Sequence, residues 1–404
     1  MAETPFVLSV SDIDLQVLHT KLDEARLPDE LEGAEWLYGA PLADIKRLLA
    51  RWKDGFDWRA AEEKTNTIPQ FTRDIEVDRF GTLNIHYIHQ KSKVKNAIPL
   101  FFSHGWSGHF LEVSKMLPLL IAAGEGCPSF HVVAYSLPGF GLSDAPKKKG
   151  FGLNQYAEIA HKLMLALGYN EYVAQGGDWG FRISRKLAAL YGVKHVKAWH
   201  TNFPVADKPT LTNYPVLWLK DQITPLTAQE RERFQHAADF NKRGTGYYVE
   251  QSTTPQTIGY SLADSPVGLL AWIYEKLILW TDHYPWTDDE VLTWISIYWF
   301  SRAGPAASLR IYFEFQTDEG QADWADTKIS PIPFGVSLFP ADHIAVRDFW
   351  ASELGYLVFK ANHSEGGHFA AYEQPERLAG DLRRMFGRDG PALGVIRGKD
   401  GYAS

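Results

Sequence analysis

The stretch GGDWG at residues 176–180 joins a strand-like run, EYVAQ at 171–175, to a helix-like run, FRISRKLAALYG at 181–192. A sharp strand-to-helix turn between glycines usually presents a nucleophile, and the usual nucleophile is serine. Here the central residue is an aspartate, Asp178. Serine suits acyl transfer, whereas a carboxylate suits displacement at a saturated carbon through an alkyl-enzyme ester. The competing interpretation is that Asp178 only caps the following helix, because Asp is a favoured N-cap.

Strand-like and helix-like segments alternate along much of the chain around this turn. The strand-like runs occupy residues 82–90, 98–106, 131–144, 171–175, 196–202, 329–340 and 355–360. Such alternation predicts the α/β class with a mostly parallel sheet.

Two regions depart from this alternation. Residues 1–75 are predicted to form helical segments that pack on the next domain through aromatic side chains, and residues 205–320 are predicted to form a helical lid over one end of the sheet. The predicted division of the chain is therefore an N-terminal segment, a first core part, a lid and a second core part, at residues 1–75, 76–204, 205–320 and 321–404.

Composition narrows the classes of function. The 404 residues carry a net charge of −8, and no basic run exceeds KKK at 147–149, which argues against a nucleic-acid partner. The single cysteine, Cys127, excludes an internal disulfide, and no zinc-type Cys/His spacing occurs. Neither a signal peptide, a membrane-spanning run nor a C-terminal retention or peroxisomal tag is recognisable. We therefore expect a cytoplasmic protein without a membrane anchor.

Polar residues follow several of the predicted strands. His104, Gly105 and Trp106 come after one strand, Asp178 lies at the turn, and Asp342 and His368 follow two later strands. Active residues of open α/β sheets collect at the carboxyl ends of the strands. The chain order of nucleophile, acid and histidine is that of α/β-hydrolases.

The chemistry explains why these residue types would occur together. An alkyl ester on Asp178 must be hydrolysed, and His368 can deprotonate a water while Asp342 orients the imidazole. The charge that develops on the ester oxygen needs N–H donors, and we expect them from Trp106 and Trp179. His104 and Gly105, in the same loop as Trp106, are expected to contact substrate.

Simpler interpretations compete for several of these residues. His368 could be an ordinary buried histidine and Asp342 a turn residue, while Glu365 is the rival for the orienting acid. His86 and His89 lie three apart on a predicted strand and are interpreted as surface or sheet residues.

The chain resembles the microsomal-type epoxide hydrolases, including the soluble fungal ones, over nearly its whole length. The resemblance rests on four segments. They are RLPDELEGAEWLYGAPLADIKRLLARWKDGFDWRAAE at 26–62, GGDWG at 176–180, DSPVGLLAWIYEK at 264–276 and EGGHFAAYEQPE at 365–376. It implies an α/β-hydrolase fold with Asp178 as nucleophile, His368 as water-activating base and Asp342 as orienting acid.

The resemblance also implies roles for two lid tyrosines, which would hold the epoxide oxygen and protonate it as the ring opens. Tyr247 in GTGYYVEQ and Tyr312 in SLRIYFE match them, and Tyr248 is a rival for the first position. The resemblance implies no cofactor and no metal, a small apolar epoxide as substrate, and a role in detoxification or secondary metabolism. It is compatible with a homodimer.

The chain also departs from the family. The family loop usually reads His-Gly-Trp-Pro-Gly-Ser, whereas this chain has HGWSGH, so that Ser107 replaces a proline and His109 replaces a serine. Phe181 follows the turn where a smaller residue is common. We expect a change in the shape of the oxyanion loop and in substrate identity.

Three other functions stay open from the sequence. A haloalkane-type dehalogenase would use the same Asp–His–Asp set with halide donors in place of two phenols. A biosynthetic cyclase would open its epoxide with an internal hydroxyl. A catalytically inactive relative would only bind a ligand. The sequence identifies neither the epoxide nor the regiochemistry and stereochemistry of its opening.

Overall fold

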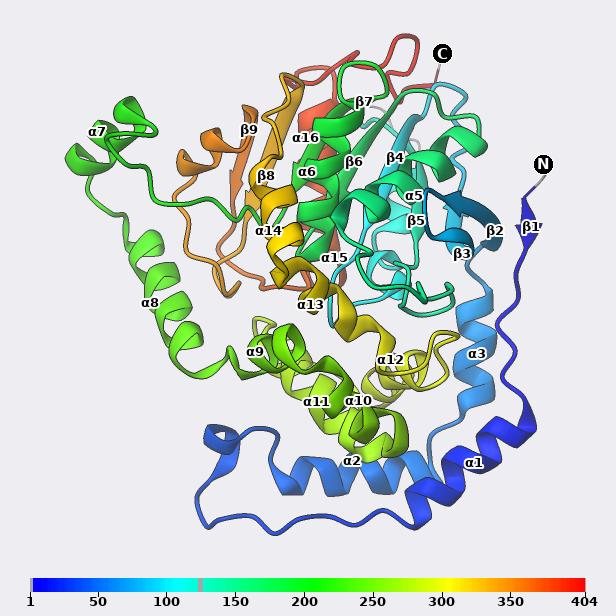
Figure 1. The fold of residues 1–404 in the computed structure, drawn as a ribbon. Helices are drawn as coiled ribbons and strands as arrows, with labels where there is room; N and C mark the ends of the chain where they lie inside the picture. The colour runs from blue at the N-terminus through cyan, green and yellow to red at the C-terminus, as the bar shows by residue number, and fades with distance from the viewer. Residues whose placement is uncertain (1–2, 123–125, 404) are drawn as a thin grey trace.

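The fold was obtained as a computed structural model that describes residues 3–122 and 126–403. Residues 1, 2 and 404, on which the expectation of no signal or tag partly rests, lie outside this part. The described residues form a nine-stranded sheet (Figure 1). Its strands are β1 (Thr4–Pro5), β2 (Gln70–Val77), β3 (Gly81–Gln90), β4 (Ile98–Ser103), β5 (Phe130–Tyr135), β6 (Tyr172–Gly176), β7 (Val196–Thr201), β8 (Pro333–Leu338) and β9 (Tyr356–Asn362).

The strand order is β1-β2-β3-β5-β4-β6-β7-β8-β9. The pairs from β1 to β5 are antiparallel, and those from β5 through β4 to β9 are parallel. The register pairs Ser103 at the end of β4 with Gly176 at the end of β6, so the loop after Ser103 and the turn after Gly176 meet at one edge. The predicted mostly parallel α/β sheet is confirmed.

Helices cover both faces of the sheet, so that strands β4 to β8 are almost wholly buried. One face packs on α5 and α6, and the other packs on α4 and α16. The helices of the core are α4 (Leu117–Ile121), α5 (Leu153–Ala166), α6 (Trp179–Tyr191), α15 (Ala370–Glu373) and α16 (Pro375–Phe386).

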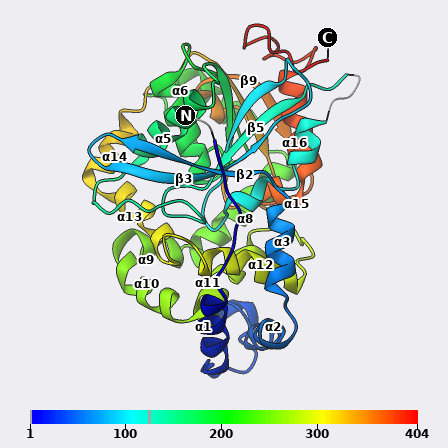
Figure 2. The same ribbon diagram turned by 90° about the vertical axis from the view of Figure 1, so that its right-hand side faces the viewer.

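The predicted helical lid follows β7. Its helices α9 to α12 lie between the sheet and the N-terminal helices α1 and α2, a layering that both ribbon views show (Figures 1 and 2). The lid consists of α7 (Pro215–Ile223), α8 (Ala228–Arg243), α9 (Gly246–Thr253), α10 (Pro255–Asp264), α11 (Pro266–Leu279), α12 (Asp288–Trp299), α13 (Arg310–Gln316) and α14 (Asp318–Ala325).

The N-terminal helices hold the lid from the side away from the sheet. They are α1 (Asp12–Asp23), α2 (Leu42–Asp54) and α3 (Trp58–Asn66). Arg51 of α2 forms an ion pair of 2.9 Å with Asp289, and the Tyr274 hydroxyl donates to Asp44 over 3.1 Å. Trp36 packs on Tyr274 with ring centroids 5.8 Å apart. These contacts of the segment are made with the lid, whereas the sequence predicts that its aromatic side chains pack on the next domain along the chain.

The prediction that residues 1–75 are only helices and turns is wrong for two stretches. β1 and β2 add to the sheet, because β2 forms a long hairpin with β3 that starts at the Val77–Gly81 pair. His86 and His89 do lie in the sheet, but both are buried rather than exposed. His86 contacts Ser136 and Gln70, a pairing that only the folded chain creates.

Within the described residues, no helix is both long enough and apolar enough to cross a membrane.

Candidate active site

Asp178 occupies a strained turn between β6 and α6. Its φ is 50° and its ψ is −123°, a region that residues with side chains rarely adopt. The flanking glycines are sterically required: a Cβ at Gly180 would lie 2.0 Å from the Ser103 carbonyl oxygen, and one at Gly176 would lie 2.4 Å from the Gly180 carbonyl oxygen. Asp178 stands at the N-cap position, yet its side chain makes no capping bond. The capping interpretation therefore does not explain this carboxylate.

Of the two predicted N–H donors, that of Trp106 forms a hydrogen bond with the Asp178 carboxylate, and that of Trp179 affects the pKa of the same group. The N–H of Trp106, in the loop after β4, donates to Asp178 Oδ1 over 2.8 Å. Burial raises the pKa of Asp178, while His368 and the backbone N–H groups of Trp179 and Trp106 act in the opposite direction. Oδ1 is thus held in a polar cradle, and Oδ2 is the carboxylate oxygen that faces the histidine.

The predicted acid and base stand beside the nucleophile. His368 Nδ1 lies 3.0 Å from Asp342 Oδ1, and His368 Nε2 lies 3.8 Å from Asp178 Oδ2. Burial opposes the charged imidazole, but Asp342, Asp178 and Glu112 together raise the pKa of His368 to about 9. The backbone N–H of His368 donates to the Trp280 carbonyl over 2.8 Å, which fixes the loop that carries the imidazole.

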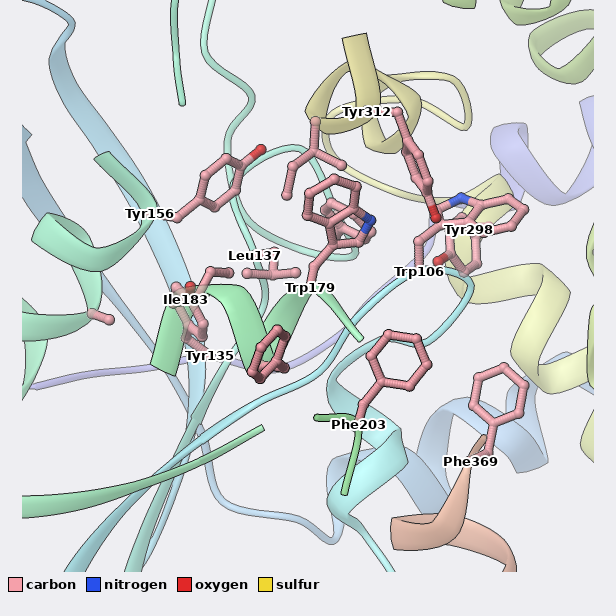
Figure 3. Packing of buried hydrophobic residues seen from close by; sticks show 14 of the residues in the cluster. Trp106, Tyr135, Leu137, Tyr156, Trp179, Ile183, Phe203, Tyr298, Tyr312 and Phe369 are labelled. Atoms are coloured by element: carbon pink, nitrogen blue, oxygen red, sulfur yellow. The ribbon is translucent and has the colours of Figure 1, made fainter. Parts of the chain in front are cut away.

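Tyr247 of α9 and Tyr312 of α13 lie near Asp178, in the lining of the same cavity. Their ring centroids are 5.9 Å apart. Trp106 stacks on Tyr247 at 5.2 Å, and Trp179 meets Tyr312 edge-on at 4.8 Å. In Figure 3, Tyr312 points from the lid toward Trp106.

Both phenols keep their protons at neutral pH. Burial, aided by the Asp178 charge, raises the pKa of Tyr247 and of Tyr312 well above the ordinary value. The Tyr312 hydroxyl is buried and has no hydrogen-bond partner of standard geometry in the described part of the chain. The Tyr247 phenol and the Trp179 side chain lie near it. A buried hydroxyl without a well-formed hydrogen bond is costly, so it is available to a ligand.

A cavity of about 280 Å³ opens onto these groups. That is just below the volume of typical drug-sized pockets, so it suits a small substrate. The cavity is lined by Asp178, Trp179, Arg182, Phe203, Val205, Phe240, Asn241, Thr245, Tyr247, Tyr248, Tyr312, His343 and Ile344.

The structure shows which of the other candidate residues lie at the site and which lie away from it. Glu365 is 61% exposed in an ion pair with Arg377, away from His368, so it is not the orienting acid. Tyr248 does line the cavity, beside Tyr247. His104 does not: its Nε2 accepts the Leu137 N–H over 3.2 Å, so it supports the loop from behind. Gly105 also lies outside the cavity lining, tight against the Asp178 carboxylate.

The altered oxyanion loop keeps its donor. The Trp106–Ser107 peptide bond is cis, and the Trp106 N–H still points at Asp178. Trp294 Nε1 donates to the Ser107 carbonyl over 2.8 Å, which anchors the loop to α12. His109 is buried against Trp294, with ring centroids 4.1 Å apart, and does not line the cavity. Ser107 and His109 of HGWSGH therefore face Trp294 of α12 and do not enter the cavity.

Three further residues belong to the site. Glu112 is buried beneath the loop, and burial raises its pKa to about 8. His343 donates its backbone N–H to Asp342 Oδ1 over 2.8 Å and lines the cavity. Arg182, one turn after Asp178, also lines it. Of these three residues, only Arg182 could have been predicted from the sequence, because a residue four positions after Asp178 lies on the same side of the helix.

Asp342, His343 and His368 could in principle hold a metal ion, because each offers a ligand atom within 4.8 Å of the others. Asp342 Oδ1 and His368 Nδ1, which a metal would need, already face each other across 3.0 Å. This arrangement fits a carboxylate that orients an imidazole better than a ligand set.

Comparison with known proteins agrees with this geometry. Residues 3–113 match the family described as "Epoxide hydrolase N terminus", and residues 98–287 match "alpha/beta hydrolase fold". Epoxide hydrolase 1 of Sus scrofa is 33% identical, over 95% of this chain and 88% of that protein.

Solved structures show the same likeness. The epoxide hydrolase of Aspergillus niger is 33% identical over 95% of each chain, with a TM-score of 0.81. The juvenile hormone epoxide hydrolase of Bombyx mori is 27% identical, over 94% of this chain and 93% of that one, with a TM-score of 0.85. The chain is a hydrolase enzyme that belongs to the epoxide hydrolase family of the α/β-hydrolase superfamily.

Proposed function

We propose that the enzyme opens a small epoxide to a vicinal diol through an alkyl ester on Asp178, which His368-activated water then hydrolyses. One observation carries the proposal. The two oxygens of Asp178 have different surroundings: Oδ1 accepts the Trp106 N–H over 2.8 Å, and Oδ2 faces His368 Nε2 across 3.8 Å. A carboxylate arranged in this way has one oxygen free to attack and one already in an oxyanion hole.

In the first step, Oδ2 of Asp178 attacks a ring carbon, and the bond between that same carbon and the epoxide oxygen breaks. The leaving oxygen is an alkoxide, which needs a proton as its charge develops. Tyr247 and Tyr312 line the same cavity and carry protons at neutral pH, so one phenol donates its proton while the other donates a hydrogen bond. The resulting tyrosinate is reprotonated from solvent before the next turnover.

In the second step, neutral His368 takes a proton from water, and the hydroxide attacks Cγ of Asp178. The negative charge that forms on Oδ1 is stabilised by the N–H groups of Trp106 and Trp179. The ester bond then breaks, and the departing diol oxygen takes the proton from His368. Asp342 stabilises the imidazolium throughout, as expected from its 3.0 Å contact.

The raised pKa of His368 explains why this residue acts as a base only in the second step. The carboxylates of Asp342 and Asp178 favour the charged imidazole in the free enzyme. An ester on Asp178 is neutral, so alkylation removes one of these negative neighbours. The pKa of His368 then falls, and the neutral base becomes available when it is needed.

Product analysis by mass spectrometry tests the proposal. Native protein and Asp178→Ala are offered terminal, aryl and trans-disubstituted epoxides, with Glu365→Gln as a control that alters an exposed acid three positions before His368 in the sequence but away from it in space. Diol from the native protein and the control, but not from Asp178→Ala, supports the ester route. Cyclic product, or product that survives Asp178→Ala, would contradict it and indicate opening by the tyrosines alone.

A further inference from the structure

An arginine that forms no ion pair in the described part of the chain borders the cavity. Arg182 lies one turn after the nucleophile on α6 and is half-buried. Its side chain forms no ion pair or hydrogen bond with any residue in the described part of the chain, and its recorded contacts are with aromatic rings. Buried charges are normally paired, so an unpaired guanidinium at a binding cavity needs an explanation.

Aromatic rings replace only part of the water that burial removes from the Arg182 guanidinium. The Arg182 guanidinium lies 4.4 Å from the ring centroid of Phe315, 5.0 Å from that of Trp324 and 5.7 Å from that of Trp179. Such cation–π contacts stabilise the charge and hold the planar group in one orientation. They satisfy none of its five N–H donors, which remain available to an acceptor. Burial accordingly lowers the pKa of Arg182.

The neighbouring polar groups extend this donor site. Asn241, Thr245 and Tyr248 line the same cavity as Arg182, and each has a side chain that can donate a hydrogen bond. Phe203, Val205, Phe240 and Ile344 supply the apolar part of the lining. The cavity thus combines an apolar wall with a set of donors around one fixed cation.

We infer that the substrate is a small epoxide that carries a carboxylate, which the guanidinium of Arg182 binds while Asp178 attacks the oxirane. This inference rests on the proposed function and narrows the apolar epoxide expected from the sequence. A guanidinium matches a carboxylate with two parallel N–H···O bonds, which suits a fixed cation near the reacting carbon. The volume of about 280 Å³ limits the spacer between carboxylate and oxirane to a few atoms.

A second role for Arg182 would be to stabilise the ionised Asp178, since its charge contributes to lowering the pKa of that carboxyl. That role would affect every epoxide alike. Carboxylate binding would affect only the acids. The ratio of rates for an acid and its neutral amide therefore separates the two roles.

The test compares kcat/KM for terminal epoxypentanoate, epoxyhexanoate and epoxyheptanoate with kcat/KM for their primary amides, and uses styrene oxide as an uncharged reference. The native enzyme is expected to favour at least one acid over its amide by about 10- to 100-fold, as is typical for a hydrogen bond to a charged group. In Arg182→Met this ratio should fall to about one or below, and Arg182→Lys should retain part of it.

Arg185→Met is the matched control. Arg185 lies on the same helix, with its guanidinium 4.6 Å from the Trp324 ring centroid, but outside the cavity lining. Its acid-to-amide ratio should equal that of the native enzyme. If styrene oxide gives diol but no acid is preferred, or if Arg182→Met keeps the preference, the inference is wrong and the proposed function stands. If no epoxide gives diol, both are wrong.

Discussion

Gly105→Ala is the substitution that most directly disturbs the contact between the oxyanion loop and the nucleophile. A Cβ at Gly105 would lie 2.2 Å from Asp178 Oδ1 and 2.6 Å from Asp178 Cγ. Real Cβ atoms essentially never approach other atoms within 3.0 Å, so the carboxylate or the loop must move by roughly 1 Å. The 2.8 Å bond from the Trp106 N–H to Oδ1 cannot survive that movement unchanged.

The expected loss follows from two known effects. A displacement of about 1 Å at a reacting group can cost about 100-fold in rate. Loss of one oxyanion-hole donor costs about 100- to 1,000-fold in kcat. These effects share one cause, so we expect diol formation to fall by about 100- to 1,000-fold rather than by their product. Overpacking should destabilise the fold by about 1–3 kcal/mol.

The assay is diol production from styrene oxide, with urea unfolding to verify that the variant is folded. The control is Gly380→Ala in α16, where an added Cβ meets no atom within 4 Å. It should keep the native rate and should be no less stable than the native protein, because alanine is the better helix former. A folded Gly105→Ala enzyme with the native rate would refute the account of the oxyanion loop.

Four further predictions test the other groups. His368→Gln should accumulate the ester, seen by intact-protein mass spectrometry as an added mass equal to that of the substrate, and unmodified protein after exposure would count against it. Asp178→Asn should lower the pKa of His368 from about 9, measured by NMR titration of the imidazole, because one negative neighbour is removed. The pKa of His368 in the folded protein lies above the usual 6.5, so its charged form stabilises the fold fully below pH 6.5, and this stabilisation is lost as the pH rises through about 9. Asp342→Asn removes one source of this stabilisation. It should reduce the free energy of unfolding by up to about 3 kcal/mol at pH 6 and have less effect above pH 9. Tyr312→Phe and Tyr247→Phe should each slow ester formation about 10- to 100-fold in single-turnover experiments, and an unchanged rate in both would exclude the phenols as proton donors.

The sheet and the meeting of the main site residues follow from features that a sequence displays locally. Short apolar runs predict buried parallel strands, and residues just after such strands meet at one edge of the sheet. Trp106 and Asp178 come together for that reason, because β4 and β6 are neighbours. His368 and Asp342 follow the same rule on β9 and β8.

Features that depend on packing between distant segments could not be predicted from local sequence patterns. The pairing of β2 with β3 needs a hairpin register that the weak alternation of FTRDIEV does not specify. Glu112 and His343 reach the site because their loops fold back beneath or beside the triad, and neither belongs to a motif. The support of the HGWSGH loop by Trp294 depends on a lid helix 187 residues away in the chain. Sequence patterns describe elements, whereas these contacts depend on how elements are assembled.

The central claim is that an ester forms on Asp178, and isotope labelling in one turnover tests it most directly. Enzyme in excess over styrene oxide is mixed in ¹⁸O-water, and the tryptic peptide of residues 163–182 is sequenced by tandem mass spectrometry, which separates Asp178 from Glu171 in the same peptide. The account predicts that ¹⁸O enters the Asp178 carboxylate and that the first diol formed carries none. Labelled diol from an enzyme whose Asp178 stays unlabelled would mean that water attacks the epoxide directly, and the ester mechanism would be wrong.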